Sequence, residues 1–389
     1  MKNKIDISNC KIIDGHCHTF FQSTKKLEQG QFIEKAANLF ASGITTESQR
    51  QALLVLKQML HELSQFLSCT SDTKDVIKTR NNQSADFREY LKNLYDDVKI
   101  NTMVVDDGFS EVQVTSTLPH VEFEEFREFV PVKVARVKRI EPLILSSVKK
   151  SSNFEDMMVD YSTSLKKAVK EEKCVAFKSI IAYRTGLDIQ KTSEDEAMKD
   201  FTSYKNGMFF PWLGGLGKTL RDFLICHTFK KSVELNVPVQ IHTGLGDADI
   251  VVEKCNPVLM LDILKDEEVQ HAKIVLLHGG YPYGTEAAWL TSIFPNVYLD
   301  VSLYPYNVGS GIQRRIMEIL EMGCISKIIY GSDGAELPEL HWLGAKMFKK
   351  GLSMALDNLI DFGTLRENEA YKVAESILSQ NAEGLYNLR

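Results

Sequence analysis

Eight short apolar segments recur along the chain, and polar or glycine-containing residues close each of them. The segments are rich in Ile and Val and too short for typical helices, so they predict buried β-strands. Segments with helical periodicity lie between most of them, at 154–169, 220–235, 257–264, 312–320 and 340–359. This alternation predicts a parallel sheet, and eight strands is the number that closes a (β/α)8 TIM barrel. The eight segments are KIIDGHCH (11–18), INTMVVDDG (100–108), PVKVARVKRIE (131–141), KCVAFKSII (173–181), VPVQIHTG (237–244), KIVLLHGG (273–280), NVYLDVSL (296–303) and KIIYGSDG (327–334).

The first connection, residues 19–97, is far longer than one helix requires. Its apolar residues recur at helical spacing, which predicts a helical insert within a single domain that spans residues 1–389. A short coiled-coil seam for a partner is the alternative, but only about two heptads are present, and this favours packing within the insert. The two apolar stripes are Leu53, Leu56, Leu60, Leu63 and Leu67, then Phe87, Tyr90, Leu91 and Leu94.

A second long connection, residues 188–219, contains the segment GMFFPWLGGLGK. Its glycine, proline and aromatic residues predict a long loop near the mouth of the barrel, with Trp212 as a candidate lid residue. The GGLGK sequence lacks the GxxxxGK[ST] spacing of a phosphate-binding loop.

Composition and charge exclude several classes of protein. Hydrophobic residues make up 44% and charged residues 25%, as in ordinary globular proteins, so a disordered chain is excluded. The net charge of −6, without a dominant basic patch, argues against a nucleic-acid binder. The longest apolar runs fall short of the roughly 18 residues of a membrane span. Seven scattered cysteines without a CxxC pair, and an N-terminus without an apolar signal region, predict a cytoplasmic protein with reduced thiols.

The motif DGHCH (14–18) stands at the end of the first predicted strand. Residues two apart share one face of a strand, so His16 and His18 can chelate a single metal ion. Asp14 is expected to support a histidine or the strand end and not to bind metal. Active sites of α/β barrels lie at the C-terminal ends of the strands, so other strand-end residues should converge there. Three more predicted strands end in such residues, namely His242, His278 and Asp333.

Lys178 lies on the fourth predicted strand, on the same face as the small residues Cys174 and Ala176. A buried lysine is costly unless it is paired or chemically altered. The side chain therefore leans into solvent, pairs with Asp14 or Asp333, or bridges metal ions after carbamylation.

Tyr183 and Arg184 follow the fourth strand and are candidates for substrate contact. A guanidinium at the mouth of a barrel can hold a carboxylate through two parallel hydrogen bonds. The alternative for Arg184 is a local pair with Asp188. We therefore expect a small-molecule substrate that bears a carboxylate.

Four of these segments resemble motifs of the amidohydrolase superfamily. IDGHCH resembles its DxHxH opening, IHTG and LLHGGYP resemble its fifth- and sixth-strand motifs, and IIYGSDG resembles its eighth-strand motif. The chain is similar to the amidohydrolase-related branch of metal-dependent hydrolases with a TIM-barrel fold. This branch includes relatives of uronate isomerase and of FluG-type proteins, and the resemblance covers essentially the whole chain.

The resemblance implies a metal centre at the strand ends. His16 and His18 would bind one divalent ion, expected to be zinc. His242 would complete that site or serve a second ion together with His278. Asp333 would bind metal and transfer protons.

The number of metal ions depends on Lys178. Relatives with two ions bridge them with a carbamylated lysine, and Lys178 stands where that lysine would. Relatives with one ion use the sixth-strand histidine, His278 in this chain, to polarise the substrate. Both arrangements stay open, and we favour two ions.

These residues predict a hydrolase that cleaves an amide, lactone or related C–N or C–O bond with metal-activated water. Asp333 would take the proton of the attacking water and return it to the leaving group, unless it only caps the helix that Pro338 starts. A metal-dependent decarboxylase or an isomerase of uronates are alternatives on the same barrel. A metal-retaining interaction protein is disfavoured, because every candidate ligand is present. A homo-oligomer stays open.

Overall fold

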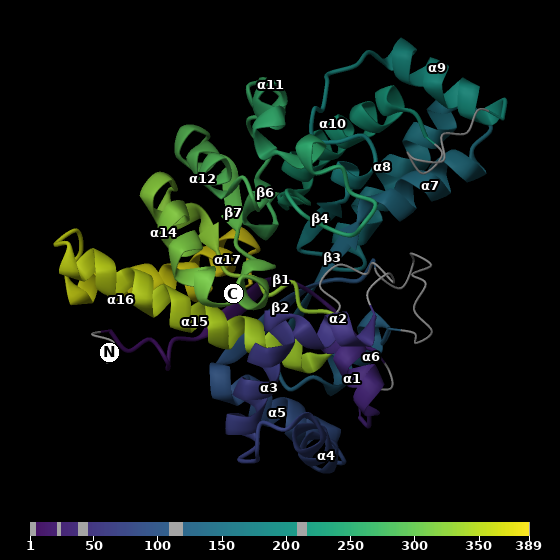
Figure 1. The fold of residues 1–389 in the computed structure, drawn as a ribbon. Coiled ribbons are helices and arrows are strands. Elements are labelled where there is room, and N and C mark those ends of the chain that lie inside the picture. Colours follow the sequence, from purple (N-terminus) through teal and green to yellow (C-terminus); the bar gives the residue numbers. More distant parts are fainter. Residues whose placement is uncertain (1–4, 22–24, 38–45, 109–119, 208–215, 389) are drawn as a thin grey trace. The chain divides into compact units, whose positions relative to one another are not determined.

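The computed structural model describes residues 5–21, 25–37, 46–108, 120–207 and 216–388, and Figure 1 shows their elements. The chain divides into two compact units. Unit 1 comprises Met1–Ala135, Val301–Glu321 and Ile328–Glu383, and unit 2 comprises Arg136–Asp300, Met322–Lys327 and Gly384–Arg389. Trp212, the candidate lid residue, lies outside the described residues.

Unit 1 holds the first two strands of the chain and the last. β1 (Ile12–His18) pairs in parallel with β2 (Ile100–Asp106). The connection between them is helical, as predicted, with α1 (Gln29–Ala36), α2 (Glu47–Ala52), α3 (Leu54–Phe66), α4 (Thr73–Gln83) and α5 (Phe87–Val98). Later elements of the unit are α6 (Phe123–Phe129), α13 (Tyr304–Asn307), most of α14 (Ile312–Met322), β8 (Ile328–Ile329), α15 (Pro338–Asp361) and α16 (Glu367–Glu375).

The helices of the insert form because their apolar residues recur at helical spacing. In α5, Asp86 caps the first turn by accepting a hydrogen bond from the N–H of Glu89. The predicted leucine run lies along α3, where Leu56 and Leu63 are buried. Phe66, at the end of this helix, packs against a tryptophan of α15 with ring centroids 5.4 Å apart. Leu56, Leu63 and Leu67 of the stripe are thus buried inside the chain, whereas Leu53 and Leu60 are half-buried.

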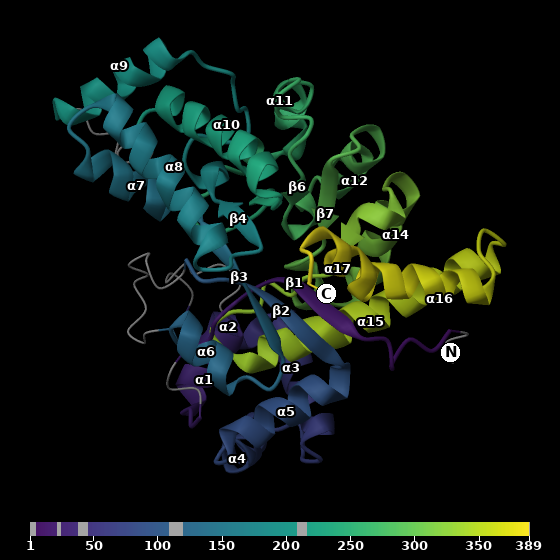
Figure 2. The ribbon, with the colours of Figure 1, turned by 180° about the vertical axis from the view of Figure 1, so that it is seen from behind.

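Unit 2 holds a run of parallel strands that pair in chain order. The strands are β3 (Lys133–Arg139, whose first residues belong to unit 1), β4 (Ala176–Ser179), β5 (Val239–Ile241), β6 (Ile274–Leu276) and β7 (Val297–Asp300). In both views α8 (Phe154–Lys170) lies beside α7 (Ile140–Lys150) and α10 (Lys218–Leu235) (Figures 1 and 2). The helices of the unit are α7 (Ile140–Lys150), α8 (Phe154–Lys170), α9 (Glu194–Lys205), α10 (Lys218–Leu235), α11 (Leu261–Leu264) and α12 (Gly284–Ile293).

The order of strands in the sheet, β1 to β8, is the same as their order in the chain. Helices separate successive strands, and the strands are mostly buried because both faces of a parallel sheet are covered. This is the organisation of a (β/α)8 TIM barrel, so the predicted fold class is confirmed. Among the described residues, every helix is too short or too polar to cross a membrane.

Candidate metal centre

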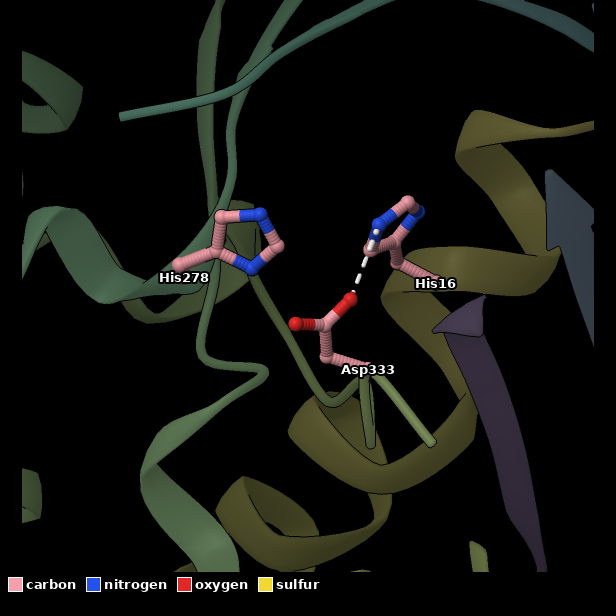
Figure 3. Close-up of side chains that lie close together, drawn as sticks. All are labelled: His16, His278 and Asp333. Carbon is pink, nitrogen blue, oxygen red and sulfur yellow. Dashed lines mark ion pairs between the residues drawn. The ribbon is translucent and has the colours of Figure 1, made fainter. Parts of the chain in front are cut away.

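The end of β1 brings two histidines to one carboxylate. His16 and His18 are buried, and Nε2 of each lies 3.4 Å from Oδ1 of Asp333, which follows β8. Figure 3 shows the ion pair between His16 and Asp333. Both imidazoles reach the same oxygen because residues two apart share a strand face. The intervening Cys17 lies on the other face, where its thiol donates to the carbonyl of Val104.

Backbone hydrogen bonds set the register between these residues. The N–H of Asp333 donates to the carbonyl of His16 at 2.9 Å. The N–H of His18 donates to the carbonyl of Gly334 at 2.8 Å. The segment after β8 therefore continues alongside β1, and this pairing holds the carboxylate opposite the two imidazoles.

Two neighbouring residues allow and support this close approach. A Cβ on Gly15 would lie 2.8 Å from the carbonyl oxygen of Tyr330, so only glycine fits there. The carboxylate of Asp14 accepts hydrogen bonds from the N–H of Ser332 at 2.8 Å and from its hydroxyl at 2.6 Å. Asp14 thus ties β1 to the segment that carries Asp333, which is the supporting contact expected for it.

Asp106, the last residue of β2, sets the tautomer of His18. Nδ1 of His18 lies 3.1 Å from the carbonyl oxygen of Asp106. A carbonyl can only accept a hydrogen bond, so Nδ1 carries the proton and Nε2 carries the lone pair that faces Asp333. Metal-binding histidines commonly donate their second ring N–H to a backbone carbonyl in this way.

Asp333 occupies the left-handed region of backbone conformation, with φ of 54°. Aspartate tolerates this region better than most residues, and such conformations often mark functional sites. α15 begins at Pro338, and its N-cap residue is Leu337, which forms no side-chain cap. The N-cap position of this helix is therefore Leu337 and not Asp333. Tyr306 donates its hydroxyl to the carbonyl of Asp333 at 3.0 Å, and burial, together with nearby carboxylates, raises the pKa of Tyr306 well above its usual value.

In unit 2, two further predicted ligands lie against each other. His242 follows β5 and His278 follows β6, and their ring centroids are 4.5 Å apart. Nε2 of His242 lies 3.1 Å from the carbonyl oxygen of Leu245, so Nε2 donates a proton and Nδ1 carries the lone pair. A metal ion bound by His242 in this conformation would contact Nδ1.

His278, like Asp333, adopts a left-handed backbone conformation, with φ of 63°. Its N–H lies 3.4 Å from Oδ1 of Asp300, the last residue of β7, which is fully buried. Asp300 is absent from the residues predicted from the sequence. The signal that could have found it is the one that found Asp333, a carboxylate at the end of a strand.

Lys178 is the third residue of β4 and is almost entirely buried. In the ladder it stands opposite Arg139 of β3 and Gln240 of β5. Its neighbour Ser179 lies on the other face of the strand, where its hydroxyl donates to Glu141 at 2.8 Å. The burial of Lys178 excludes a side chain that leans into solvent, and pairing or carbamylation remain as interpretations.

The two residues predicted to contact substrate, Tyr183 and Arg184, follow β4. Tyr183 ends a short 3₁₀ helix, Ile181–Tyr183, and Arg184 is the next residue. The ring of Tyr183 packs against that of His242, with centroids 4.6 Å apart, and its hydroxyl accepts the N–H of Asp247 at 3.0 Å. Arg184 is half-buried. Burial lowers the pKa of Arg221 to about 10, and the positive charge of Arg184 contributes to this shift. The carboxylate of Glu141 acts in the opposite direction and raises the pKa of Arg221.

The histidine side chains at the end of β1 and the carboxylate after β8 fit a divalent metal ion. Imidazole and carboxylate ligands lie about 2.0–2.1 Å from zinc, so neighbouring ligands of a tetrahedral site lie about 3.4 Å apart. The two nitrogen–oxygen distances of 3.4 Å match this spacing. The imidazoles are buried while the side chain of Asp333 is 17% exposed, so a small molecule can reach the carboxylate.

A TIM barrel that presents histidine and aspartate at its strand ends has the organisation of a metal-dependent barrel enzyme. Residues 206–388 match the family model of the amidohydrolases. The match confirms the resemblance to the amidohydrolases over this part of the chain, which contains the motifs IHTG, LLHGGYP and IIYGSDG; IDGHCH lies outside the matched residues.

Individual proteins of known sequence or structure agree with this family. Protein fluG of Emericella nidulans is 24% identical over 402 residues, which cover 97% of this chain and 46% of that protein, so the chain spans about half the length of this relative. A protein from Lactobacillus casei, provisionally described as a metal-dependent hydrolase, is 26% identical with a TM-score of 0.86 over 98% of this chain and 96% of that one. A uronate isomerase from Thermotoga maritima shares the fold, with a TM-score of 0.69 at 13% identity over 98% of this chain and 95% of that one. Together the matches support a metal-dependent enzyme of the amidohydrolase superfamily.

Proposed function

We propose that the protein is a metal-dependent hydrolase that cleaves an amide, lactone or related C–N or C–O bond of a small molecule. The observation that carries the proposal is the pair of imidazole nitrogens, on His16 and His18, that face Oδ1 of Asp333 at 3.4 Å. Imidazole and carboxylate groups are ligands of divalent metal ions, and each of these nitrogen–oxygen distances suits two neighbouring ligands. The amidohydrolase match over residues 206–388 supports the same function.

We assign His278 of unit 2 to the same metal centre. His278 stands just after the C-terminal end of β6, and the HxH motif stands at the C-terminal end of β1. The active-site residues of TIM barrels lie at the C-terminal ends of different strands. His16, His278 and Asp333 each offer one atom that can bind a metal ion. His242 would add Nδ1, and a carbamylated Lys178 would bridge a second ion.

The chain's own residues bind the substrate and move the proton. When bound, the metal ion supplies Lewis acidity toward water and toward a carbonyl oxygen. Asp333 takes a proton from the attacking water on its carboxylate and returns it to the leaving group. Arg184 holds a carboxylate of the substrate, and Tyr183 contacts the substrate beside His242. Asp333 is suited to its role because it remains partly accessible.

Two measurements test this proposal. Metal analysis of protein purified without chelator should give at least about one divalent ion per chain, and a metal-free protein would favour an interaction role. A screen of N-acyl amino acids, dipeptides, lactones and uronates, scored by product mass, then identifies the reaction. Hydrolysis adds the mass of one water to the summed products, isomerisation leaves the mass unchanged, and decarboxylation removes carbon dioxide. If the screen finds only isomerised or only decarboxylated products, the protein is an isomerase or a decarboxylase and the proposed hydrolase function is wrong.

Three further expectations accompany the proposal. Residues 1–389 would act as one domain with an insert at 19–97, the protein would work in the cytoplasm, and it could assemble as a homo-oligomer. Limited proteolysis tests the first, cell fractionation tests the second, and light scattering of the purified protein tests the third.

A further inference from the structure

His341, in the first turns of α15, makes three polar contacts inside unit 1. Its position in the sequence does not predict these contacts. Its Nε2 lies 3.0 Å from the carbonyl oxygen of His18 and 3.0 Å from that of Gly334. Its Nδ1 lies 3.4 Å from the hydroxyl of Tyr95, on α5. Because carbonyls only accept, Nε2–H donates to both oxygens, and Nδ1 accepts from the tyrosine hydroxyl.

Both carbonyls belong to the backbone that carries the candidate ligands. His18 is itself one ligand, and Gly334 directly follows Asp333. The Gly334 carbonyl also accepts the N–H of His18 at 2.8 Å, so one oxygen receives hydrogen bonds from β1 and from α15. A Cβ on Gly334 would lie 2.3 Å from Cδ2 of His341, so the ring is in close contact with this backbone. His341 thus joins the end of β1 to the segment that holds Asp333.

The helical insert fixes α15 on both sides of His341. Glu339 accepts hydrogen bonds from Nε of Arg80, on α4, at 2.6 Å and from the hydroxyl of Tyr90, on α5, at 2.8 Å, and all three side chains are buried. Trp342 donates its Nε1–H to Asp97, in the last turn of α5, at 2.7 Å. The imidazole between them is therefore held by residues of the insert.

We propose that His341 is a positioning residue of the metal centre. Its Nε2–H fixes the separation of His18 and Asp333, and Tyr95 of the insert holds the ring in the required tautomer. The inference rests on the proposed function and gives the helical insert a role in it.

A pair of amide variants tests the inference through metal affinity. In His341→Gln the amide nitrogen can occupy the place of Nε2, whereas in His341→Asn it can occupy only the place of Nδ1. Affinity for Co²⁺ is measured on metal-free protein by competition with a coloured chelator. We expect His341→Gln to bind Co²⁺ within about 3-fold of the wild type and His341→Asn to bind it about 10- to 100-fold more weakly, as for other supporting contacts of metal ligands.

Controls separate positioning from general stability. His227, another helical histidine, lies in unit 2, and His227→Asn should leave Co²⁺ affinity unchanged. Tyr95→Phe should weaken Co²⁺ binding by about 3- to 10-fold, the effect of one neutral hydrogen bond, whereas Tyr161→Phe, which loses the contact with Thr228, should have no effect.

Each outcome decides between the two proposals. Equal Co²⁺ affinity of the two His341 variants would overturn the positioning role while leaving the proposed function intact. If the His341 variants fail to fold, unchanged affinity of Tyr95→Phe would overturn it instead. A wild-type protein that binds no Co²⁺ would overturn the proposed function itself.

Discussion

Replacing Asp333 by asparagine tests the proton-transfer role while leaving the fold in place. Asparagine is one of the few residues that tolerate the left-handed conformation that position 333 requires, where φ is 54°. The backbone contacts persist, because the N–H still donates to His16 and the carbonyl still accepts from Tyr306. The side-chain oxygen can still face both imidazoles. We therefore expect the melting temperature to stay within a few degrees of the wild type.

The size of the effect follows from what the amide cannot do. The carboxylate oxygen of Asp333 lies 3.4 Å from Nε2 of His16 and of His18, where a metal ion and its water would be held. An amide cannot accept a proton at neutral pH. General acid–base catalysis contributes about 10²–10⁴-fold in rate, which corresponds to about 3–5 kcal/mol of activation free energy. We expect kcat to fall by at least about 10²-fold, with most of the bound metal retained.

The assay compares three quantities in the same preparations: kcat on the substrate found by the mass screen, metal content and melting temperature. Asp75→Asn serves as the matched control, because Asp75 also lies in unit 1 and its carboxylate accepts hydrogen bonds from the N–H and the hydroxyl of Thr70. It should leave kcat unchanged. Turnover of Asp333→Asn at the wild-type rate would remove Asp333 from the mechanism.

Three further variants probe the interior of the two units. Glu339→Gln leaves the buried charge of Arg80 without its partner and should lower the free energy of unfolding by about 3–5 kcal/mol in urea titrations; an unchanged midpoint would contradict this. The wild type should hold about two metal ions per chain, and Lys178→Ala should hold fewer, with partial recovery when short carboxylic acids are added. One tightly bound ion in the wild type, together with an active Lys178→Ala variant, would favour a mononuclear centre. Burial lowers the pKa of His120 from 6.5 to about 4, so the folded state binds fewer protons than the unfolded state between these values. The neutral His120 ring contributes at most about 3 kcal/mol to the free energy of unfolding; this contribution is complete above pH 6.5 and is lost as the pH falls toward 4. His120→Asn, which keeps the hydrogen-bond donor to the carbonyl of Thr19, should lose less unfolding free energy over this pH range than the wild type. An equal loss in the two proteins would refute the assignment.

The strand ends of this barrel were predictable because two simple rules apply to them. Short apolar runs mark strands, and parallel strands of a barrel end on the same side. These rules predict His16, His18 and Asp333 as strand-end residues. In the structure, Nε2 of each histidine lies 3.4 Å from Oδ1 of Asp333. Asp14 precedes the candidate ligands on the same strand face, and its carboxylate accepts hydrogen bonds from Ser332, beside Asp333.

Other parts of the centre depend on contacts that no local pattern contains. His341 lies on a helix and meets His18 through packing between residues 323 positions apart. The tautomers of His18 and His242 depend on the carbonyls of Asp106 and Leu245, whose positions only the folded chain defines. Asp300 was missed for a different reason: apolar residues follow it in the segment NVYLDVSL, so the sequence alone does not show that the strand ends at this carboxylate.

The central claim is that the histidines and Asp333 form a metal centre, and metal content measured by mass spectrometry tests it most directly. Wild-type protein, purified without chelator, should carry at least about one divalent ion per chain. The variants His16→Ala and His278→Ala should each lose most of this metal, whereas His227→Ala, which lies away from the strand ends, should retain it. Retention of wild-type metal content in both His16→Ala and His278→Ala would contradict the account.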